Sequence, residues 1–398
     1  MVRSIAIIER DYPMTDKRTF PPAGGRRYVR CRRSGFCLSL IALAASAVLP
    51  SGAEAQVCRD GVEPVKVHCD TLFAIGRPDG PVEEYLARDP RGGSVLMDVG
   101  PDGLIWILNP IDGHLMAFSD AGERLVSYSR KGSGPGEFQQ AMALTAVTSG
   151  AWTWDWPNQQ LCRWSLGGGL LETHRTDLPQ PMFNRLVIDR TGTAWFLHDV
   201  VEEPEYEEIP VELRCLEPGG EQQAVAAFGI PGAMLPGRGF ALSLFPSFAP
   251  LPAGGIVIAT THEYDLFGFT AVADEAILHW HFPSLETPYT ARQRRTGGRG
   301  GFTPAGGELI EPPLLSHQPD LTDIHPACAE AFWITTQVRS DEGLRRIDYI
   351  DCEGNRTGSY WFPGRTGTIR GTIEHPVVLT YTPDGQQVFG LRIRIEDR

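Results

Sequence analysis

The chain has 398 residues, of which 42% are hydrophobic and 21% are charged, and it contains 44 glycines and 32 prolines. Its formal net charge is −13. A surplus of acidic groups repels phosphate backbones, so this charge argues against nucleic-acid binding.

The first 55 residues have the three parts of a secretory signal peptide. A basic stretch, Arg26–Arg33, precedes an apolar run, Phe36–Leu49. This run is roughly 14 residues long, whereas a transmembrane helix needs about 20. Ala53-Glu54-Ala55 offers the small residues that signal peptidase accepts, so we expect cleavage after Ala55 and export to the periplasm or the exterior.

Removal of residues 1–55 makes the remaining chain more acidic. That segment holds 9 of the 36 Lys and Arg residues and 4 of the 49 Asp and Glu residues, which leaves 27 basic against 45 acidic groups, a net charge of −18. No stretch of the mature chain is apolar enough to span a membrane.

Residues 56–398 repeat one short unit: a strand, a Gly-bearing turn, a strand with an aromatic residue, a third strand, and a turn of the Asp-x-x-Gly type. The clearest copy has strands at Val95–Val99, Leu104–Ile107, His114–Phe118 and Arg124–Ser129. The runs are short, β-branched or aromatic, and bounded by Gly, Pro, Asp and Asn, as is typical of strands. The other copies carry their strands within Ala151–Trp164, Leu186–Phe196, Gly254–Ile258, Phe332–Ile350 and Val377–Gly385.

Four antiparallel strands recurring six times predict an all-β fold, a six-bladed β-propeller over residues 56–398. No stretch has the periodicity of a helix that could form a layer. Leu285–Leu315, rich in Arg, Gly and Pro, is expected to be a loop excursion. The last copy ends at the C-terminus and Val65–Ile75 looks like a strand, so we expect this N-terminal strand to join the final blade and close the ring.

The segment Tyr128–Phe138 reads Tyr-Ser-Arg-Lys-Gly-Ser-Gly-Pro-Gly-Glu-Phe. It resembles the junction in bacterial exported six-bladed β-propeller proteins related to NHL repeats, where G-x-G-P-G-E-F follows the fourth strand of a blade. The resemblance implies the fold and the exported location, and it implies no catalytic residues. Because no helix N-terminus and no Lys-Ser/Thr follow, a blade-to-blade turn is favoured over a phosphate-binding loop.

Six cysteines remain after residue 55, an even number that permits disulfides in an oxidising compartment. If Phe332–Gln337 and Arg345–Asp351 form a hairpin, Cys328 and Cys352 lie nearly opposite each other, which suits a disulfide. Cys58–Cys69 is the next candidate. The alternative is that the cysteines are small buried hydrophobic residues.

In a propeller, the loops after the second and fourth strands share one face at the channel mouth. Four residues expected there carry metal-binding groups: His198, Asp199, His262 and Glu263. Two imidazoles and two carboxylates suit Zn²⁺ or another divalent cation. The alternative is that they are solvated loop residues, because no motif with metal-ligand spacing is present.

A second set of candidates would contact a ligand at the channel mouth. Arg185 and Arg370, predicted at the starts of inner strands, would clamp a carboxylate or pair with Asp320 across the channel. The full set is Asn184, Arg185, Asp320, Arg370 and Asp155.

Two functions are therefore open. One is a binding scaffold that recognises an extracellular protein or a small ligand through its loop-bearing face. The alternative is a metal-dependent enzyme of the lactonase or lyase type, with a divalent ion at the channel mouth; this alternative rests on analogy between propellers alone. No hydrolase motif is present.

Overall fold

The computed structural model describes most of the chain beyond the predicted signal peptide. The described residues lie within the unit that spans 45–398, and every regular element among them is a β-strand, as the periodicity predicts. None of the described residues forms a helix of the length and apolarity needed to cross a membrane. The described ranges are 56–57, 63–76, 95–110, 112–129, 131–167, 169–178, 186–199, 208–231, 234–235, 239–240, 246–251, 253–260, 264–272, 276–288, 320–328, 331–351, 353–362, 368–370, 377–381 and 388–395.

The clearest sequence repeat forms a sheet of four antiparallel strands, in the order β3-β4-β5-β6. Every residue of β4 and β5 is buried, because both faces of the sheet are covered. Gly122 turns the chain after β5 with φ +80°, and a Cβ there would lie 2.5 Å from Phe73, so only glycine fits. The strands are β3 (Leu96–Val99), β4 (Ile105–Asn109), β5 (His114–Phe118) and β6 (Arg124–Ser129).

The next two copies form sheets of the same kind, with orders β10-β9-β8-β7 and β11-β12-β13-β14. The predicted strands Ala151–Trp154 and Leu161–Trp164 lie within β8 and β9. The bounds are β7 (Ala141–Val147), β8 (Gly150–Asp155), β9 (Gln160–Ser165), β10 (Gly169–Arg175), β11 (Leu186–Ile188), β12 (Ala194–Asp199), β13 (Glu208–Leu216) and β14 (Gln222–Pro231).

The fourth copy forms the sheet β17-β18-β19-β20, and a short strand from the N-terminal side adds to it in parallel. Of the expected loop excursion, residues 285–288 have no regular structure, and the rest lies outside the described residues. The strands are β1 (Gln56–Val57), β15 (Met234–Leu235), β16 (Gly239–Phe240), β17 (Ser247–Pro250), β18 (Ile256–Thr260), β19 (Tyr264–Phe269) and β20 (Leu278–Phe282); β15 and β16 pair with each other.

The last two copies share one sheet of eight strands, in the order β21-β22-β23-β24-β2-β27-β26-β25. The N-terminal strand β2 pairs in parallel with β24 at two residues and antiparallel with β27 from Val67 to Ile75. The predicted segment therefore pairs with the C-terminal copy. The strands are β2 (Val65–Ile75), β21 (Leu321–Cys328), β22 (Ala331–Arg339), β23 (Arg345–Ile350), β24 (Arg356–Phe362), β25 (Thr368–Arg370), β26 (Val377–Tyr381) and β27 (Val388–Ile395).

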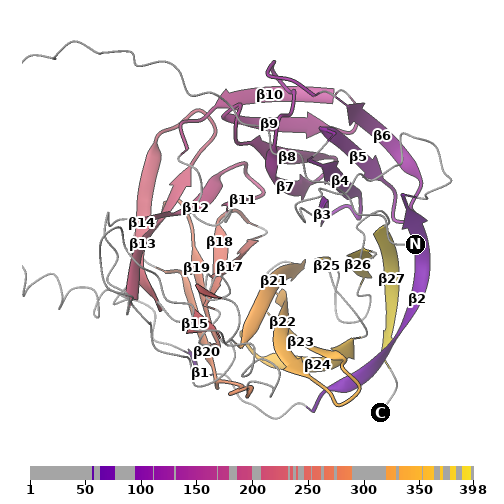
Figure 1. The fold of residues 1–398 in the computed structure, drawn as a ribbon, viewed down its shortest axis with the longest axis vertical. Helices are drawn as coiled ribbons and strands as arrows, with labels where there is room; N and C mark the ends of the chain where they lie inside the picture. Colours follow the sequence, from indigo (N-terminus) through magenta and orange to yellow (C-terminus); the bar gives the residue numbers. More distant parts are fainter. Residues whose placement is uncertain are drawn as a thin grey trace, which may run out of the picture. The chain divides into compact units, whose positions relative to one another are not determined.

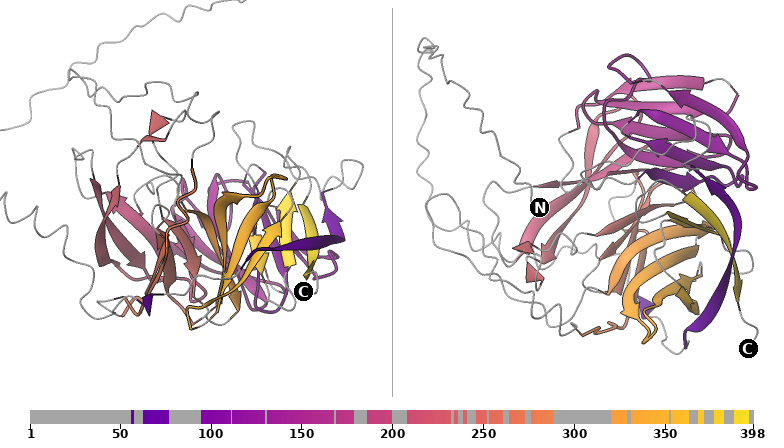
Figure 2. Two further views of the ribbon diagram at one scale, coloured as in Figure 1. Left: turned by 90° about the horizontal axis from the view of Figure 1, so that it is seen from below. Right: turned by 45° about the vertical axis from the view of Figure 1, so that its right-hand side comes forward.

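The sheets lie around a ring, with their first strands nearest its centre (Figure 1). Contacts between first strands run from β3 to β7, β11, β17, β21 and β25, and β25 touches β3 again. The fold is therefore all-β and propeller-like. Seen from the side, the strands run between the two ends of the ring (Figure 2).

The core lies between neighbouring sheets. One apolar cluster joins Trp106 of β4 to Trp164 of β9, and another joins Trp154 of β8 to Phe196 of β12. The aromatic residues that mark the second strand in several copies are among the largest fully buried side chains of this core. The fully buried examples are Trp106, Trp154, Trp195 and Trp333.

The pairing of β2 with β27 can be tested at Phe73, which is 8% exposed and packs with Ile75 and Leu379. We expect Phe73→Ala to lower the free energy of unfolding by about 3–5 kcal/mol, since it removes a buried aromatic ring. Leu72→Ala is the control, because the neighbouring side chain is 36% exposed. Urea denaturation of both variants measures the difference, and equal losses would contradict the buried placement of β2.

Candidate functional site

Because consecutive strands of each copy are antiparallel, different loops lie at the two ends of the ring. The turns after first and third strands lie at one end, which we call the turn end. The loops after second and fourth strands lie at the other, which we call the junction end because it holds the β6–β7 junction, Gly132–Phe138. The metal and ligand residues predicted from the sequence were expected at the junction end.

The junction Gly132–Phe138 is a backbone turn between two sheets, as its glycines predict. The Gly132 N–H donates to the Phe138 carbonyl at 3.1 Å, and the Gly134 N–H donates to Glu137 Oε2 at 2.8 Å. Gly136 has φ +71°, and a Cβ there would lie 2.8 Å from Leu170. The glycines thus serve the turn and its close packing.

Asp155, a predicted ligand residue at the end of β8, holds this junction in place. Its Oδ2 accepts the backbone N–H groups of Gln139 and Gln140 at 2.9 and 2.7 Å, and its Oδ1 accepts the N–H of Asn158 at 3.1 Å. Burial raises the pKa of the Asp155 carboxyl, and these three hydrogen bonds oppose the rise. The side chain is 2% exposed, so its observed role is structural.

Asn158 completes the same arrangement. Its side-chain amide donates to the carbonyl oxygens of Gly132 and Glu137 at 2.9 and 3.0 Å. Asp155 and Asn158 therefore fix the turn to the end of β8 and the loop that follows it, and both side chains are engaged with backbone groups.

The predicted metal site lies only partly within the described residues. His198 is half-buried near the end of β12, and Asp199 is the last residue of that strand. His262 and Glu263 lie outside the described residues. Within the part of the chain that the structure describes, no group of three or more His, Cys, Asp or Glu side chains is placed to hold a metal ion. The four-residue metal site stays a prediction.

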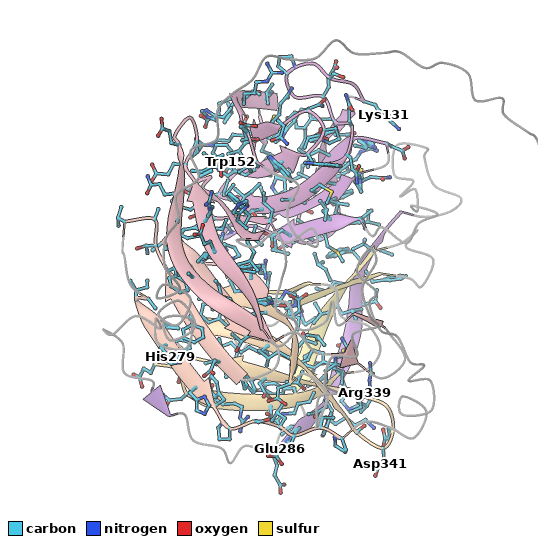
Figure 3. All side chains as sticks on the ribbon, turned by 60° about the vertical axis from the view of Figure 1, so that its left-hand side comes forward. Lys131, Trp152, His279, Glu286, Arg339 and Asp341 are labelled. Carbon is cyan, nitrogen blue, oxygen red and sulfur yellow. The ribbon has the colours of Figure 1, made fainter. Side chains whose placement is uncertain are left out.

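Two histidines on β20 meet a carboxylate on β19. His281 Nδ1 lies 2.7 Å from Asp265 Oδ1, and His279 Nε2 lies 3.6 Å from the same oxygen. His279, labelled in Figure 3, also stacks on Phe267 with ring centroids 4.3 Å apart. The pair of imidazoles on one side of β20 thus has a carboxylate neighbour on the adjacent strand.

The hairpin predicted between Cys328 and Cys352 is confirmed, and no disulfide is present among the described cysteines. The predicted hairpin exists, with Ser340 and Gly343 in its turn. Cys328 is the last residue of β21, but its side chain and the whole of Cys352 are not among the described parts of the chain. The Cys328–Cys352 disulfide therefore stays a prediction. Cys69 has a free thiol, and its predicted partner Cys58 lies outside the described residues, so the Cys58–Cys69 bond also stays a prediction.

Two further cysteines are buried in the core. Cys162 and Cys215 have free thiols, and both side chains are almost fully buried. Burial raises the pKa of Cys215 to about 11. A thiol with so high a pKa is a poor nucleophile, and it behaves as a small apolar side chain.

A cavity of about 880 Å³ opens at the turn end of the ring. Its wall includes the ends of first strands or the turns that follow them, and it reaches outward to Leu72 and Phe73 of β2. The charged lining residues are Arg163, Arg190, Arg370, Arg392 and Asp120, and the apolar ones include Val99, Val147, Pro326, Ala327 and Val377.

A chain of polar contacts crosses this cavity wall from sheet to sheet. Arg370 at the end of β25 forms an ion pair with the buried carboxylate of Asp98 on β3. Asp98 Oδ2 accepts the N–H of Ala146 on β7 at 2.9 Å, and Arg190 Nη1 donates to the Ala146 carbonyl at 3.5 Å. The Nε atoms of Arg190 and Arg370 are buried and have no hydrogen-bond partner among the described residues.

Burial and neighbouring charges shift the pKa values of Arg190 and His325. Burial lowers the pKa of Arg190, and Arg370 lowers it further, whereas Asp98 and Asp102 raise it. His325 on β21 is 6% exposed, and burial lowers its pKa despite Asp323, whose Oδ2 lies 3.8 Å from His325 Nε2. Arginine keeps its proton in proteins, and a histidine with a lowered pKa is neutral at pH 7.

Arg370 corrects one detail of the sequence analysis. It is the last residue of the three-residue strand β25, so it lies at the turn end and not at the start of an inner strand. Asp320 is buried and directly precedes β21, at the junction end. Arg370 forms its ion pair with Asp98 and not with Asp320. Asn184 and Arg185 lie outside the described residues.

Sequence reasoning missed Arg190 because it occupies a turn, Asp189-Arg190-Thr191-Gly192, that was interpreted only as a strand connection. Asp189 accepts hydrogen bonds from the N–H groups of Thr191 and Thr193 at 2.8 and 3.1 Å. The turn is thereby fixed, and Arg190 is carried at its second position. The sequence feature that could have pointed to Arg190 as a site residue is its position in a turn that begins with Asp189 and ends with Gly192.

No family model matches the chain, and no curated protein matches it by sequence. Among solved structures, a member of the DUF4221 family from Bacteroides vulgatus has a TM-score of 0.51 at 8% identity, covering 84% of this chain and 100% of that one. At this identity the likeness supports the fold alone.

Two other similar structures have lower TM-scores. A protein described as exported, from Bacteroides fragilis, has a TM-score of 0.48 at 10% identity, covering 86% of this chain and 99% of that one. A calcium-binding protein, regucalcin, from Agrobacterium tumefaciens has a TM-score of 0.42 at 14% identity, covering 87% and 98%.

The structural role of Asp155 can be tested by Asp155→Ala. We expect this substitution to lower the free energy of unfolding by about 3 kcal/mol, because it leaves three backbone N–H groups without their charged acceptor. Gln139→Ala serves as the control, since alanine keeps the backbone N–H that Asp155 accepts and removes only the exposed side-chain contact of Gln139 with Ser133. Thermal and urea denaturation measure the effect. A stable Asp155→Ala protein would show that the carboxylate is free for another role.

Proposed function

We propose that this chain is an exported binding protein that takes a small ligand in the cavity at the turn end of its ring. The observation that carries the proposal is the cavity, whose volume of about 880 Å³ falls in the range of small-molecule sites, about 300–1,000 Å³. Its lining combines apolar side chains with a few convergent charged groups, the composition typical of such sites.

The proposal includes a ring of six blades closed by β2. The contacts among the first strands β3, β7, β11, β17, β21 and β25 support it. In this interpretation the eight-stranded sheet is two blades, β21–β24 and β25–β27 with β2, joined where β2 crosses from one to the other. The junction Gly132–Phe138, which resembles that of exported six-bladed propellers, agrees with the same count.

Export is part of the proposal. It rests on the basic, apolar and small-residue segments within residues 1–55, which would leave the propeller at 56–398. The ligand would then be met in the periplasm or outside the cell. The predicted metal-dependent enzyme remains an alternative that rests on His198, Asp199, His262 and Glu263.

Blocking the cavity tests the function. Thr148 lines the cavity from the exposed turn after β7, so Thr148→Trp is expected to fill its mouth without disturbing the core. Ligand-observed NMR with a library of small fragments should show fragments that bind the native protein and lose about 90% or more of their signal change in the variant, an order-of-magnitude loss in occupancy.

Gln139→Trp is the matched control, because Gln139 is also polar and exposed but lies at the junction end. It should bind the same fragments as the native protein. If no fragment binds, or if Gln139→Trp loses binding as Thr148→Trp does, the cavity is not the binding site.

A further inference from the structure

The cavity wall holds two guanidinium groups with unused hydrogen-bonding capacity. Arg370 uses Nη1 on the Ile369 carbonyl at 2.9 Å and Nη2 on Asp98, while its Nε is buried without a partner among the described residues. Arg190 uses Nη1 in a long contact of 3.5 Å, and its Nε is likewise unpaired within the description. A buried donor without an acceptor is costly, so such sites favour an acceptor supplied by a ligand.

The buried charges of the wall leave one positive charge in excess. Arg190 and Arg370 face a single buried carboxylate, Asp98, and His325 is neutral at pH 7. Asp102 is also near, but it is exposed and accepts the N–H groups of Leu104 and Ser149, so water screens its charge. A ligand with one negative charge would balance the site.

The other charged lining residues do not change this balance. Arg163 is paired with Glu172 at 3.1 Å and lies 5.7 Å from the ring centroid of Trp152, which Figure 3 labels. Arg392 and Asp120 are exposed at the outer part of the cavity and carry opposite charges. The excess positive charge is therefore concentrated at Arg190 and Arg370.

The rest of the wall suits an apolar molecular body. Val99, Val147, Pro326, Ala327 and Val377 line the same cavity and offer no charged group. Burial of apolar surface stabilises a complex by about 25 cal/mol per Å² removed from water. A ligand that bears one anionic group on an apolar body would match both parts of the wall.

We propose that the cavity binds an organic monocarboxylate, with its carboxylate at Arg190 and Arg370 and its apolar body against the surrounding valines and prolines. This inference rests on the proposed binding function and names the ligand class. A carboxylate carries one charge and accepts paired N–H donors from guanidinium groups. A phosphate monoester carries about −1.5 to −2 charges at pH 7, more than the excess positive charge in the wall.

Four probes with the same ring separate the possibilities: benzoate, phenyl phosphate, benzyl alcohol and benzylamine. Isothermal titration calorimetry of the native protein should give the highest affinity for benzoate. Arg190→Gln should reduce benzoate affinity at least about tenfold, because a hydrogen bond to a charged group is lost. It should change the affinity for benzyl alcohol less than about twofold, a difference within ordinary variation between contacts.

Arg214→Gln is the matched control. Arg214 lies on β13 of the same sheet, is partly buried, and pairs with Glu212 at 2.7 Å away from the cavity lining. It should leave benzoate affinity unchanged. Thermal denaturation of both variants checks that each is folded, and Arg190 is chosen over Arg370 because it leaves the Asp98 ion pair intact.

The results with the four probes distinguish a wrong ligand class from a wrong binding function. If benzyl alcohol or benzylamine binds more tightly than benzoate and Thr148→Trp abolishes that binding, the cavity binds ligands but the carboxylate assignment is wrong. Tighter binding of phenyl phosphate, or an equal loss in Arg190→Gln and Arg214→Gln, also overturns the assignment. If neither these probes nor any fragment binds, the binding function itself fails.

Discussion

The carboxylate of Asp98 is the contact on which the turn end of the ring depends. First strands of neighbouring sheets share no backbone ladder, so side chains must hold them in register. Asp98 does so twice, through the Arg370 ion pair on one side and the Ala146 N–H on the other. Asp189 has the same function between its sheet and the next, where its Oδ2 accepts the Gly255 N–H at 2.7 Å. Such charge-assisted hydrogen bonds are stronger than neutral ones.

A third buried carboxylate, that of Asp348, joins two sheets further from the centre of the ring. Asp348 on β23 is fully buried, binds Arg346 through two hydrogen bonds of 2.8 and 3.0 Å, and accepts the hydroxyl of Tyr264 on β19 at 3.0 Å. Burial raises the pKa of Tyr264 well above its usual value, with the negative charge of Asp348 adding to the rise. The tyrosine thus stays protonated and donates, so the inter-sheet contact holds across the physiological pH range.

The repeating strands could be predicted because their signals are local. Trp106 and Trp195 fill the space between sheets, and each sits in a run of apolar residues bounded by turn-forming residues. The site could not be predicted in the same way. Arg370 required knowledge of where the short strand β25 ends, and Asp155 looked like a free loop carboxylate until its three backbone donors were placed. Both depend on tertiary contacts that no local pattern encodes.

The strand β2 contributes both to the cavity wall and to the pairing with β27. β2 brings Leu72 and Phe73 to the cavity wall, and the same strand joins the N-terminal side of the chain to β27. Arg370 on β25 and Asp98 on β3 meet across the boundary between the last sheet and the first. The proposed ligand would contact both sides of that boundary. Since a ligand that binds only the folded state stabilises it, occupation of the cavity would stabilise the part of the ring where β2 pairs with β27.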